Sequence, residues 1–539
     1  MFRAVTIHRG QSYSWIDFEG CVYNLETTDM ISELFQKYGT DCVHHINGDF
    51  AFVLYDVVQN QLFGAVDRLG AKTLYYHFDD KCFEYSTAFL PLCNGKNYTI
   101  NCYARQCYFT MQYIPSPHTI VNEIKKLNPG ECFSLFLDSG ELKIWQYWDL
   151  YDNSCGFDKP KSYEEAQSVC QELIEDSVRL RMRHEKKQKL GTFLSGGIDS
   201  SIVNMFVAHQ RHDITAYSVS FGESDWDESK YAKSVAEKLG IGFESIRCSA
   251  SEAIVLIDGL QQYYDEPMGD ASMIPTSFLC EKAGEHLDIA LGGDGGDEMF
   301  FGYPRYLRYA GRKNIYRVPK GLRNALAVLS DAVGKNRIAT SLRMKNVQEL
   351  YMNRRPSNDA ELFDALKIQQ SLEQCKYLYA DNDIRRCFND FDIKTLMCQA
   401  YNVKLDRAAL RGHLIARSPL LDYRIAEYTR LLPIDYCYTP VVGQKRVLRD
   451  LLCKELPREL FERKKRGFGV PVGQWFREEL KDYLVDVLNE NTVSLLPDFD
   501  GKKLIRVRDR HIEGKEDQTT LLWLCVNYIA WYNLFKRYK

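Results

Sequence analysis

The sequence predicts an α/β protein in which a strand-rich N-terminal part precedes a parallel sheet with a helical elaboration. In the first ~145 residues, short stretches rich in aromatic and β-branched residues alternate with turns. A polar run containing Gly and Pro follows at residues 151–160 and is typical of an exposed linker. Beyond this run, stretches with helical spacing alternate with short apolar strands, as expected for a parallel sheet.

Each predicted element follows from local spacing. Residues 50–56 and 62–66 are expected to be strands joined by a short turn, so they form a hairpin-like pair. Helical spacing over residues 163–183 precedes an apolar strand at 190–194 and a helix at 200–209. From about residue 316 onward the apolar spacing is mostly helical. The predicted division is one domain at residues 1–150, a linker at 151–163 and a second domain at 164–539.

Bulk composition narrows the class of protein. A chain of 539 residues is too long for one typical core, so two or three domains are expected. Hydrophobic residues at 45% and charged residues at 26% exclude a disordered chain. The 69 Lys and Arg nearly balance the 73 Asp and Glu, which gives a net charge of -4 and no overall attraction to nucleic acid or an anionic membrane. Small ligands are therefore the expected partners.

The lack of a recognisable targeting signal and the pattern of cysteines both favour a cytoplasmic location. The first ten residues lack the apolar stretch of a signal peptide, and no later window approaches the ~20 apolar residues that span a bilayer. The 17 cysteines are scattered, with no pair or cluster at zinc spacing, as expected for free thiols in a reducing compartment. We expect a cytoplasmic protein with no membrane partner and no nucleic-acid partner.

The strongest motif is the turn Leu194-Ser195-Gly196-Gly197-Ile198-Asp199-Ser200-Ser201 between a predicted strand and a predicted helix. Glycines let the backbone approach a phosphate, a helix N-terminus offers amide donors, and hydroxyls add hydrogen bonds, so this turn suits pyrophosphate. The carboxylate of Asp199 would repel an anion unless a cation such as Mg²⁺ lay between them. A Ser/Gly turn that merely caps a helix is the alternative, and for two glycines alone it is the better explanation.

A second acidic, glycine-rich loop favours a nucleotide-binding site over a simple helix-capping turn. It is Leu291-Gly292-Gly293-Asp294-Gly295-Gly296-Asp297-Glu298, directly after a probable strand at residues 287–290. Open α/β sheets bind ligands at the carboxyl ends of their strands. We expect Asp297 to complete a magnesium site with Asp199. Taken alone, a glycine-rich turn with solvated acids is an equally good explanation of this loop.

These loops belong to a longer series of ordered matches, by which the chain resembles the asparagine synthetase B family. That family includes β-lactam synthetases and lasso-peptide cyclases, and the resemblance runs over nearly the whole chain. The matching segments are residues 195–201, 218–222, 227–228, 265–267, 274–276, 293–303, 403–408, 417–422, 443–449 and 463–469. The resemblance implies a class II glutaminase-like αββα sandwich of the Ntn-hydrolase type, followed by a PP-loop ATP pyrophosphatase domain.

The resemblance also implies roles for individual residues. The first loop grips the ATP phosphates, and Asp199 and Asp297 hold Mg²⁺. An acid at Asp294 accompanies attack by ammonia, whereas β-lactam synthetases carry tyrosine there. The implied ATP-binding residues are Phe193, Leu194, Ser195, Gly196, Gly197, Asp199, Ser200, Ser201, Val219, Gly292 and Gly293.

The family's catalytic lysine matches Lys465 in the run Arg463-Lys464-Lys465-Arg466. A cation aimed at developing negative charge in a dry site can contribute several kcal/mol. Such a basic run is usually a solvated surface, and only the following Gly467-Phe468-Gly469 favours the functional interpretation. We assign the role to Lys465 rather than Lys464 only from its position within the matching segment.

The glutaminase half departs from the family. Residues 62–76 and 113–130 match its strands and loops, but such a glutaminase needs cysteine directly after the initiator methionine, where this chain has Phe2. Glu19 replaces an asparagine expected to stabilise the oxyanion, the segment before it is shortened, and Cys21 has no convincing partner. We therefore expect a degenerate glutaminase domain with no nucleophile. A misassigned start is an alternative explanation of Phe2, but it does not explain the shortening.

We predict an ATP-dependent amide ligase that activates a small-molecule or peptide carboxylate as an acyl-adenylate and transfers it to ammonia or another amine. Asparagine synthesis with free ammonia is the nearest specific activity, and an amide synthetase or macrocyclase that closes a ring within one substrate is the alternative. A noncatalytic scaffold and a tRNA-modifying enzyme are hypotheses from other classes; the latter predicts a basic RNA-binding surface. A homodimer is expected from the resemblance alone.

Overall fold

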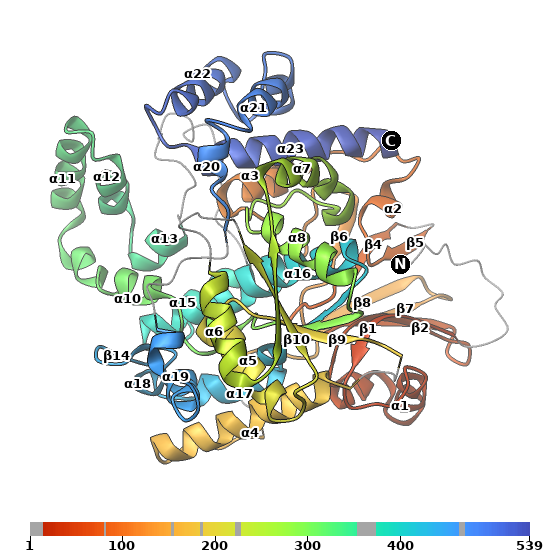
Figure 1. Cartoon of the computed structure of the whole chain (residues 1–539). Helices are drawn as coiled ribbons and strands as arrows, with labels where there is room; N and C mark the ends of the chain where they lie inside the picture. The colour runs from red at the N-terminus through yellow and green to blue at the C-terminus, as the bar shows by residue number, and fades with distance from the viewer. Residues whose placement is uncertain are drawn as a thin grey trace.

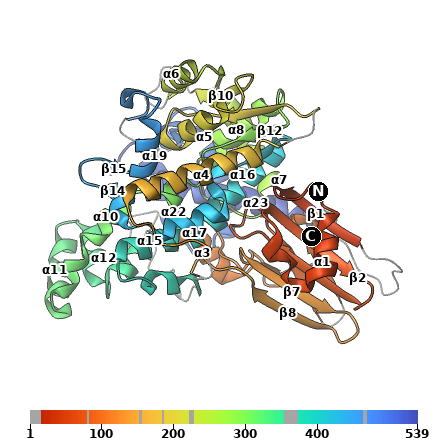
Figure 2. The same ribbon diagram turned by 90° about the horizontal axis from the view of Figure 1, so that it is seen from below.

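The computed structural model describes residues 15–79, 82–151, 156–183, 187–220, 228–352, 373–462 and 469–539. The N-terminal strands lie at one side of the molecule, and a helical hairpin of α11 (Lys320–Ala332) and α12 (Asn336–Arg343) lies at the opposite side (Figure 1, Figure 2). A parallel sheet with its helices lies between them (Figure 1). Within the described residues, no helix is long and apolar enough to cross a membrane.

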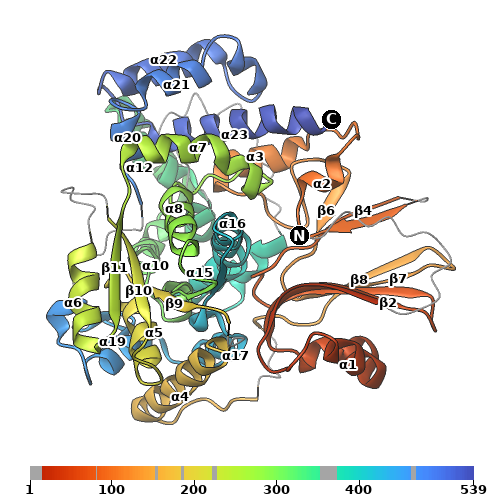
Figure 3. The ribbon, with the colours of Figure 1, turned by 45° about the vertical axis from the view of Figure 1, so that its right-hand side comes forward.

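The N-terminal part is a sandwich of two antiparallel sheets between helices, as the resemblance implied (Figure 3). Helix α1 (Met30–Tyr38) covers the outer face of the larger sheet, while α2 (Leu90–Cys93) and α3 (Cys102–Met111) lie beyond the smaller one (Figure 3). The larger sheet has the order β1 (Trp15–Val22), β2 (Gly48–Asp56), β3 (Gln61–Val66), β7 (Glu131–Phe136) and β8 (Glu141–Gln146). The smaller sheet has the order β5 (Phe83–Ser86), β4 (Tyr75–Phe78) and β6 (Ile124–Lys126).

Strand β2 shows why this part of the sequence is so apolar. Its side chains alternate between two buried faces: Phe52 packs toward α1, whereas Val53 packs between the two sheets. The predicted hairpin with β3 is confirmed, with Asp56 paired to Gln61. Asn60 in the turn has a φ of 48°, a left-handed conformation that asparagine tolerates better than most residues.

The turn after β3 is organised by the buried carboxylate of Asp67. It accepts hydrogen bonds from the backbone amides of Leu69 at 3.1 Å, Ala71 at 3.0 Å and Lys72 at 2.8 Å. Burial and the nearby charge of Asp49 raise the pKa of Asp67 to about 7, despite the opposing effect of these amides. The folded protein therefore holds this proton more tightly than the unfolded chain does.

This pKa predicts a pH-dependent contribution to stability. Because the folded pKa lies above the ordinary value of 3.8, the contribution is complete below about pH 4 and is lost as the pH rises through about 7. We expect Asp67→Asn to remove this pH-dependent contribution. The melting temperature of the variant should therefore fall less than that of the wild type between about pH 5 and pH 8. Asp138→Asn, at an exposed turn, is the control. Parallel pH profiles for Asp67→Asn and the wild type would contradict the assignment.

The predicted parallel sheet is confirmed. Its order is β11 (Gly242–Arg247), β10 (Thr215–Ser220), β9 (Leu190–Phe193), β12 (Ile289–Leu291) and β13 (Ile415–Arg417). Every paired strand in it runs parallel. The associated helices are α4 (Tyr163–Arg181), α5 (Ile198–Ala208), α6 (Ser229–Leu239), α7 (Ala250–Tyr264) and α8 (Met273–Gly284).

The remainder of the chain is largely helical, as its spacing predicts. A continuous segment passes from α15 (Ile384–Asp392) through a π-helical stretch (Ile393–Tyr401) into α16 (Asn402–Arg411). The other helices are α9 (Gly296–Met299), α10 (Pro304–Ala310), α13 (Val347–Met352), α17 (Tyr423–Leu431), α18 (Ile434–Cys437), α19 (Arg446–Leu452), α20 (Val472–Trp475), α21 (Lys481–Val487), α22 (Gly501–Ile512) and α23 (Thr519–Tyr538). A two-stranded ribbon of β14 (Tyr438–Thr439) and β15 (Gly443–Gln444) precedes α19.

The two halves of the chain are joined by buried polar contacts. Helix α23 accepts hydrogen bonds from both halves. The Tyr108 hydroxyl of α3, in the N-terminal half, donates to the Leu524 carbonyl at 2.9 Å, and Gln261 of α7, in the C-terminal half, donates to Asn527 at 2.7 Å. Next to the linker, the Trp148 indole donates to Glu427 at 2.8 Å. The domain boundaries given above remain a prediction.

Candidate active site

The two glycine-rich loops lie next to each other because β9 and β12 are neighbouring strands. From β9 the chain builds the sheet outward through β10 and β11, and it then returns to place β12 on the other side of β9. The strand order therefore reverses between β9 and β12. Crevices at such reversal points, outside the carboxyl ends of the strands, are the usual ligand sites of open α/β sheets.

The first loop has a shape that only glycine permits at one position. Gly196 has a φ of 71°, and a β-carbon there would lie 2.7 Å from the Ala232 amide nitrogen. Helix α5 begins at Ile198 with Gly197 as its N-cap, and no side chain caps it. Amides in the first turn of a helix lack intrahelical acceptors and are suited to bind an anion.

The serines of this loop are arranged around one another. The hydroxyl oxygens of Ser195 and Ser200 lie 3.1 Å apart, and the Ser200 hydroxyl donates to the Gly197 carbonyl at 3.2 Å. The side chains of Leu194 and Ser201 are buried, so only their backbone could contact a nucleotide. Asn204 of α5 braces the turn by donating to the Phe193 carbonyl at 3.1 Å.

The second loop packs directly on the first through two glycines. A β-carbon on Gly293 would lie 2.5 Å from the Ser200 amide nitrogen, and one on Gly296 would lie 2.3 Å from Asp199 Oδ1. Any larger residue at these positions would push the loops apart. This close contact brings Asp199 and Asp297 to the same place.

A buried lysine connects these two aspartates. The Lys445 ammonium donates a hydrogen bond to Asp199 and forms an ion pair with Asp297, whose nearer carboxylate oxygen lies 2.7 Å from it. Lys445 is 4% exposed, which makes it a fixed internal cation. Gly302 leaves room for it, because a β-carbon on Gly302 would lie 2.1 Å from Lys445 Cε.

The sequence does not indicate Lys445 as a site residue. It lies in a matching segment, residues 443–449, but nothing in that segment shows whether Lys445 or Arg446 points inward. Its direction depends on a left-handed backbone, with a φ of 57°, at the start of α19. A local pattern of residue types does not encode that conformation.

The electrostatics keep Lys445 charged. Burial by itself would lower the pKa of this ammonium, but the carboxylates of Asp199 and Asp297 offset burial and raise the pKa above its ordinary value. The three groups therefore form one buried charged cluster beside the phosphate-binding turn.

The same carboxylates fit a magnesium ion carried by a nucleotide. They converge on one positive charge, and carboxylate oxygens are the ligands that Mg²⁺ prefers. Two protein carboxylates leave the other coordination positions to phosphate oxygens and water. Among the described residues there is no cluster of three or more His, Cys, Asp or Glu that could hold a metal without such a nucleotide.

Asp294 lies beside the same crevice and faces a second lysine that the sequence does not indicate. A β-carbon on Gly292 would lie 2.8 Å from Asp294 Oδ2, which places this side chain over Gly292. Burial raises the pKa of Asp294, and the positive charge of Lys404 opposes this rise. The Lys404 ammonium donates hydrogen bonds to the Ser272 hydroxyl at 2.8 Å and to the Asp270 carboxylate at 3.4 Å.

Three of the ATP-binding residues that the resemblance implies, Phe193, Val219 and Gly292, lie on or directly after strands of the parallel sheet. Phe193 at the end of β9 pairs in register with Tyr217 of β10, and Val219 follows two positions later on β10. Gly292 lies across from Phe193, because a β-carbon on Gly292 would lie 3.8 Å from the ring. The assigned catalytic Lys465 lies outside the described residues, as does the run at 463–468.

Glu19, which the resemblance places where an oxyanion-stabilising asparagine is expected, belongs to a network of charged side chains. Glu19 of β1 accepts a hydrogen bond from Thr87 and lies 3.7 Å from the Lys72 ammonium. Lys72 in turn forms an ion pair with Asp406 of α16, 334 residues away. Glu19 is therefore tied to the second half of the chain.

Cys21 differs from the expectation that it has no partner. Its sulfur accepts a hydrogen bond from the Arg417 guanidinium at 3.6 Å, and the thiol is half-buried where β1 meets β13. All 15 cysteines for which the structure describes side chains carry free thiols, in line with the expectation of no disulfide framework.

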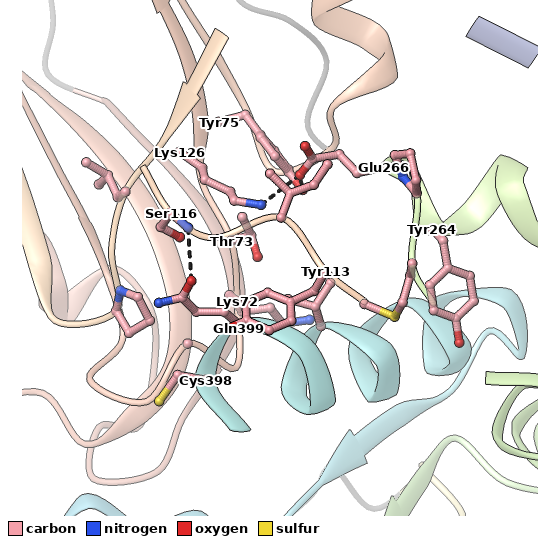
Figure 4. Close-up of a pocket in the computed structure, with 17 residues that line it drawn as sticks. Lys72, Thr73, Tyr75, Tyr113, Ser116, Lys126, Tyr264, Glu266, Cys398 and Gln399 are labelled. Carbon is pink, nitrogen blue, oxygen red and sulfur yellow. Dashed lines mark hydrogen bonds and ion pairs between the residues drawn. The ribbon is translucent and has the colours of Figure 1, made fainter. Parts of the chain in front are cut away.

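A cavity of about 540 Å³, part of it open to solvent, lies between the two halves (Figure 4). Its charged lining groups are already paired: the Lys126 ammonium donates to Glu266 at 2.8 Å (Figure 4). At its other side the Ser116 amide donates to Gln399 at 2.9 Å (Figure 4). Both contacts cross from the N-terminal part to the C-terminal part.

Comparisons with known proteins identify the family. A family model described as asparagine synthase matches residues 170–533, and one described as glutamine amidotransferase domain matches residues 19–148. Asparagine synthetase (glutamine-hydrolyzing) 1 of Bacillus subtilis strain 168 is 27% identical over 561 residues, covering 99% of this chain and 86% of that protein. The putative asparagine synthetase (glutamine-hydrolyzing) 2 of Methanocaldococcus jannaschii is 31% identical over 427 residues, covering 75% of this chain and 81% of that protein.

One solved structure, described as the allosteric regulatory enzyme of purine biosynthesis, is similar over 46% of this chain and 62% of that chain, with a TM-score of 0.19 and 10% identity. The asparagine synthase model covers well over half of the chain, and its segment contains both glycine-rich loops and Lys445. The chain belongs to the asparagine synthase family.

Proposed function

We propose that this protein uses ATP to activate a carboxylate as an acyl-adenylate and transfers the acyl group to ammonia or another amine, without using its own glutaminase-like half to release ammonia. Family membership supports the coarser part, an ATP-dependent ligase that forms C–N bonds. The observation that carries the finer part is Glu19 in its network with Thr87, Lys72 and Asp406.

The proposed first step forms the adenylate. A carboxylate oxygen of the substrate attacks the α-phosphorus of ATP, the bond to the bridging oxygen breaks, and pyrophosphate leaves. The first-loop amides and Lys445 would neutralise charge on the departing pyrophosphate. Magnesium would be held by Asp199 and Asp297, and it would supply further neutralisation of phosphate charge.

The proposed second step forms the amide. The nitrogen lone pair attacks the acyl carbon, AMP leaves, and the nitrogen must lose a proton. Asp294 is the group we assign to accept it, because burial raises its pKa and makes the carboxylate a better base. The cleft must also exclude water, which would otherwise hydrolyse the adenylate.

Glu19 argues against glutamine hydrolysis at the N-terminal site. Hydrolysis of an amide passes through an oxyanion, which needs hydrogen-bond donors around it. A carboxylate presents only acceptors and repels an oxyanion, and Glu19 is already engaged by Thr87 and Lys72. Burial by itself lowers the pKa of Lys72, but Asp406 and Glu19 offset that effect and raise the pKa, so the Lys72 ammonium stays charged.

The test is ATP/pyrophosphate exchange against a panel of carboxylates that begins with aspartate. Asp199→Ala serves as the inactive control, and ammonia, glutamine or other amines are then added to assay amide formation. We expect exchange with one acid, amide formation from ammonia or an amine, and no release of glutamate from glutamine. Amide formed from glutamine would refute the proposed loss of glutaminase activity.

The same experiment separates the alternatives. A substrate that carries both groups and cyclises without added amine would identify a natural-product synthetase or macrocyclase, for which holding the amine near the adenylate supplies a large effective concentration. Binding of Mg-ATP without exchange on any acid would favour a noncatalytic scaffold.

We further propose that the protein is located in the cytoplasm. The homodimer remains an expectation from the resemblance.

A further inference from the structure

The helical hairpin of α11 and α12 extends away from both sheets and from the two glycine-rich loops (Figure 1, Figure 2). The two helices pack on each other. Their shared interior is small, with Ala327 and Ala339 fully buried. Arg323 ties the hairpin together by donating to the carbonyls of Leu342 at 2.8 Å and Met344 at 2.7 Å.

The outer face of α11 is apolar, and within the described part of the chain its side chains are exposed. Leu322, Leu326, Leu329 and Val333 recur every four or three residues, which places them on one face of the helix. Leu322 is 56% exposed, Leu329 is 64% exposed and Val333 is 68% exposed. Residues 315–338 contribute seven of the 17 large apolar side chains that the described residues expose. Arg323 and Ala327 on the neighbouring face make the contact with α12, so the outer face is not needed to hold the hairpin together.

The hairpin lies within a basic segment of an acidic protein, and residues 320–343 alone contain five Lys and Arg and one acid, a formal charge of +4. Residues 308–345 contain ten Lys and Arg and a single acid, Asp331, which gives this segment a formal charge of +9. The whole chain carries -4, so the remaining residues together carry -13. Asp331 is itself paired with Arg343. Exposed Lys313 and Lys320 lie before and at the start of α11, and exposed Lys335 follows its end.

From this combination we propose that the α11–α12 hairpin binds the surface of an anionic lipid bilayer. Helices with a broad apolar face bordered by Lys and Arg lie in the headgroup region with that face inserted. The basic residues supply the complementary charge for anionic headgroups. The expectation of no membrane partner rested on net charge and on the absence of a spanning segment, and a whole-chain average does not reveal a charge confined to one hairpin.

The shape and charge of the hairpin favour a bilayer over a second copy of the chain. A two-fold interface would bring two identical basic clusters together, and like charges would oppose it. The exposed side chains are on a projecting helix, which a bilayer can accept without a matching groove.

The test is sedimentation of the full-length protein with vesicles of phosphatidylcholine alone or mixed equally with phosphatidylglycerol. We expect binding to the mixed vesicles only, and loss of binding in about 1 M salt, where the screening length falls to roughly 3 Å. Leu326→Glu with Leu329→Glu should weaken binding at least about tenfold. Lys320→Gln with Lys335→Gln should weaken it roughly fivefold for each lysine. Val441→Glu, at a position 95% exposed elsewhere, is the matched control and should bind like the wild type.

Several outcomes would overturn the proposal. They are no binding to mixed vesicles at low salt, equal binding by the double-leucine variant, or a wild-type dimer in light scattering that this variant converts to a monomer. The last result would assign the face to a second copy. ATP/pyrophosphate exchange should be unchanged in all of these variants, which verifies that they are folded and separates this proposal from the proposed reaction.

Discussion

Replacing Lys445 with methionine is expected to lower ATP/pyrophosphate exchange by about 10²–10³-fold, the range seen when one fixed donor to developing charge is removed. The ammonium lies between Asp199 and Asp297 at the end of the phosphate-binding turn. Without it, two carboxylates repel each other and repel the nucleotide. Exchange assayed at saturating substrate and Mg²⁺ measures the effect.

Two matched variants separate this role from a general loss of folding. Lys394→Met removes another buried lysine, whose ammonium lies 4.0 Å from Asp149 and over the Trp148 ring rather than between Asp199 and Asp297. Its exchange rate should stay near that of the wild type. Lys445→Arg keeps the charge and should retain more exchange than Lys445→Met. A folded Lys445→Met protein with wild-type exchange would show that Lys445 is structural only.

Adding one methyl group at Gly293 or Gly296 is the second change with a large expected effect. The new β-carbon of Gly293→Ala would lie 2.5 Å from a backbone nitrogen of the first loop, and that of Gly296→Ala would lie 2.3 Å from Asp199 Oδ1. The loops must separate to relieve the backbone contact at Gly293, and the Asp199 side chain must shift to relieve the contact at Gly296. A displacement of about 1 Å in a catalytic constellation can cost roughly 10²-fold in rate, and we expect a loss of that size in exchange.

Gly321→Ala provides the control, because a β-carbon at Gly321 meets no atom within 4 Å. It lies in α11, so the same substitution should leave exchange unchanged and should not lower the melting temperature. Wild-type exchange in both Gly293→Ala and Gly296→Ala would contradict the close packing of the two loops as a requirement for activity.

The sequence by itself determined the elements whose patterns are local. Alternation predicted the β2–β3 hairpin, and helical spacing predicted α4, which begins at Tyr163 as expected and ends at Arg181 rather than 183. The alternation of strands and helices predicted the parallel sheet. The two glycine-rich loops were also identified from sequence, because glycine, hydroxyl and acid residues at strand ends are short-range signals.

Only the tertiary structure decided which distant groups meet. Lys445 and Asp199 are 246 residues apart, and Lys72 and Asp406 are 334 residues apart. The Lys404 charge at Asp294 and the Arg417 contact at Cys21 are likewise absent from any local pattern, and spacing alone does not show that the apolar face of α11 is exposed. Such contacts depend on strand order, on side-chain direction and on single backbone conformations such as the left-handed φ of Lys445. Residue spacing indicates the secondary structure of one segment. The packing of the whole chain determines which charged side chains are buried next to each other.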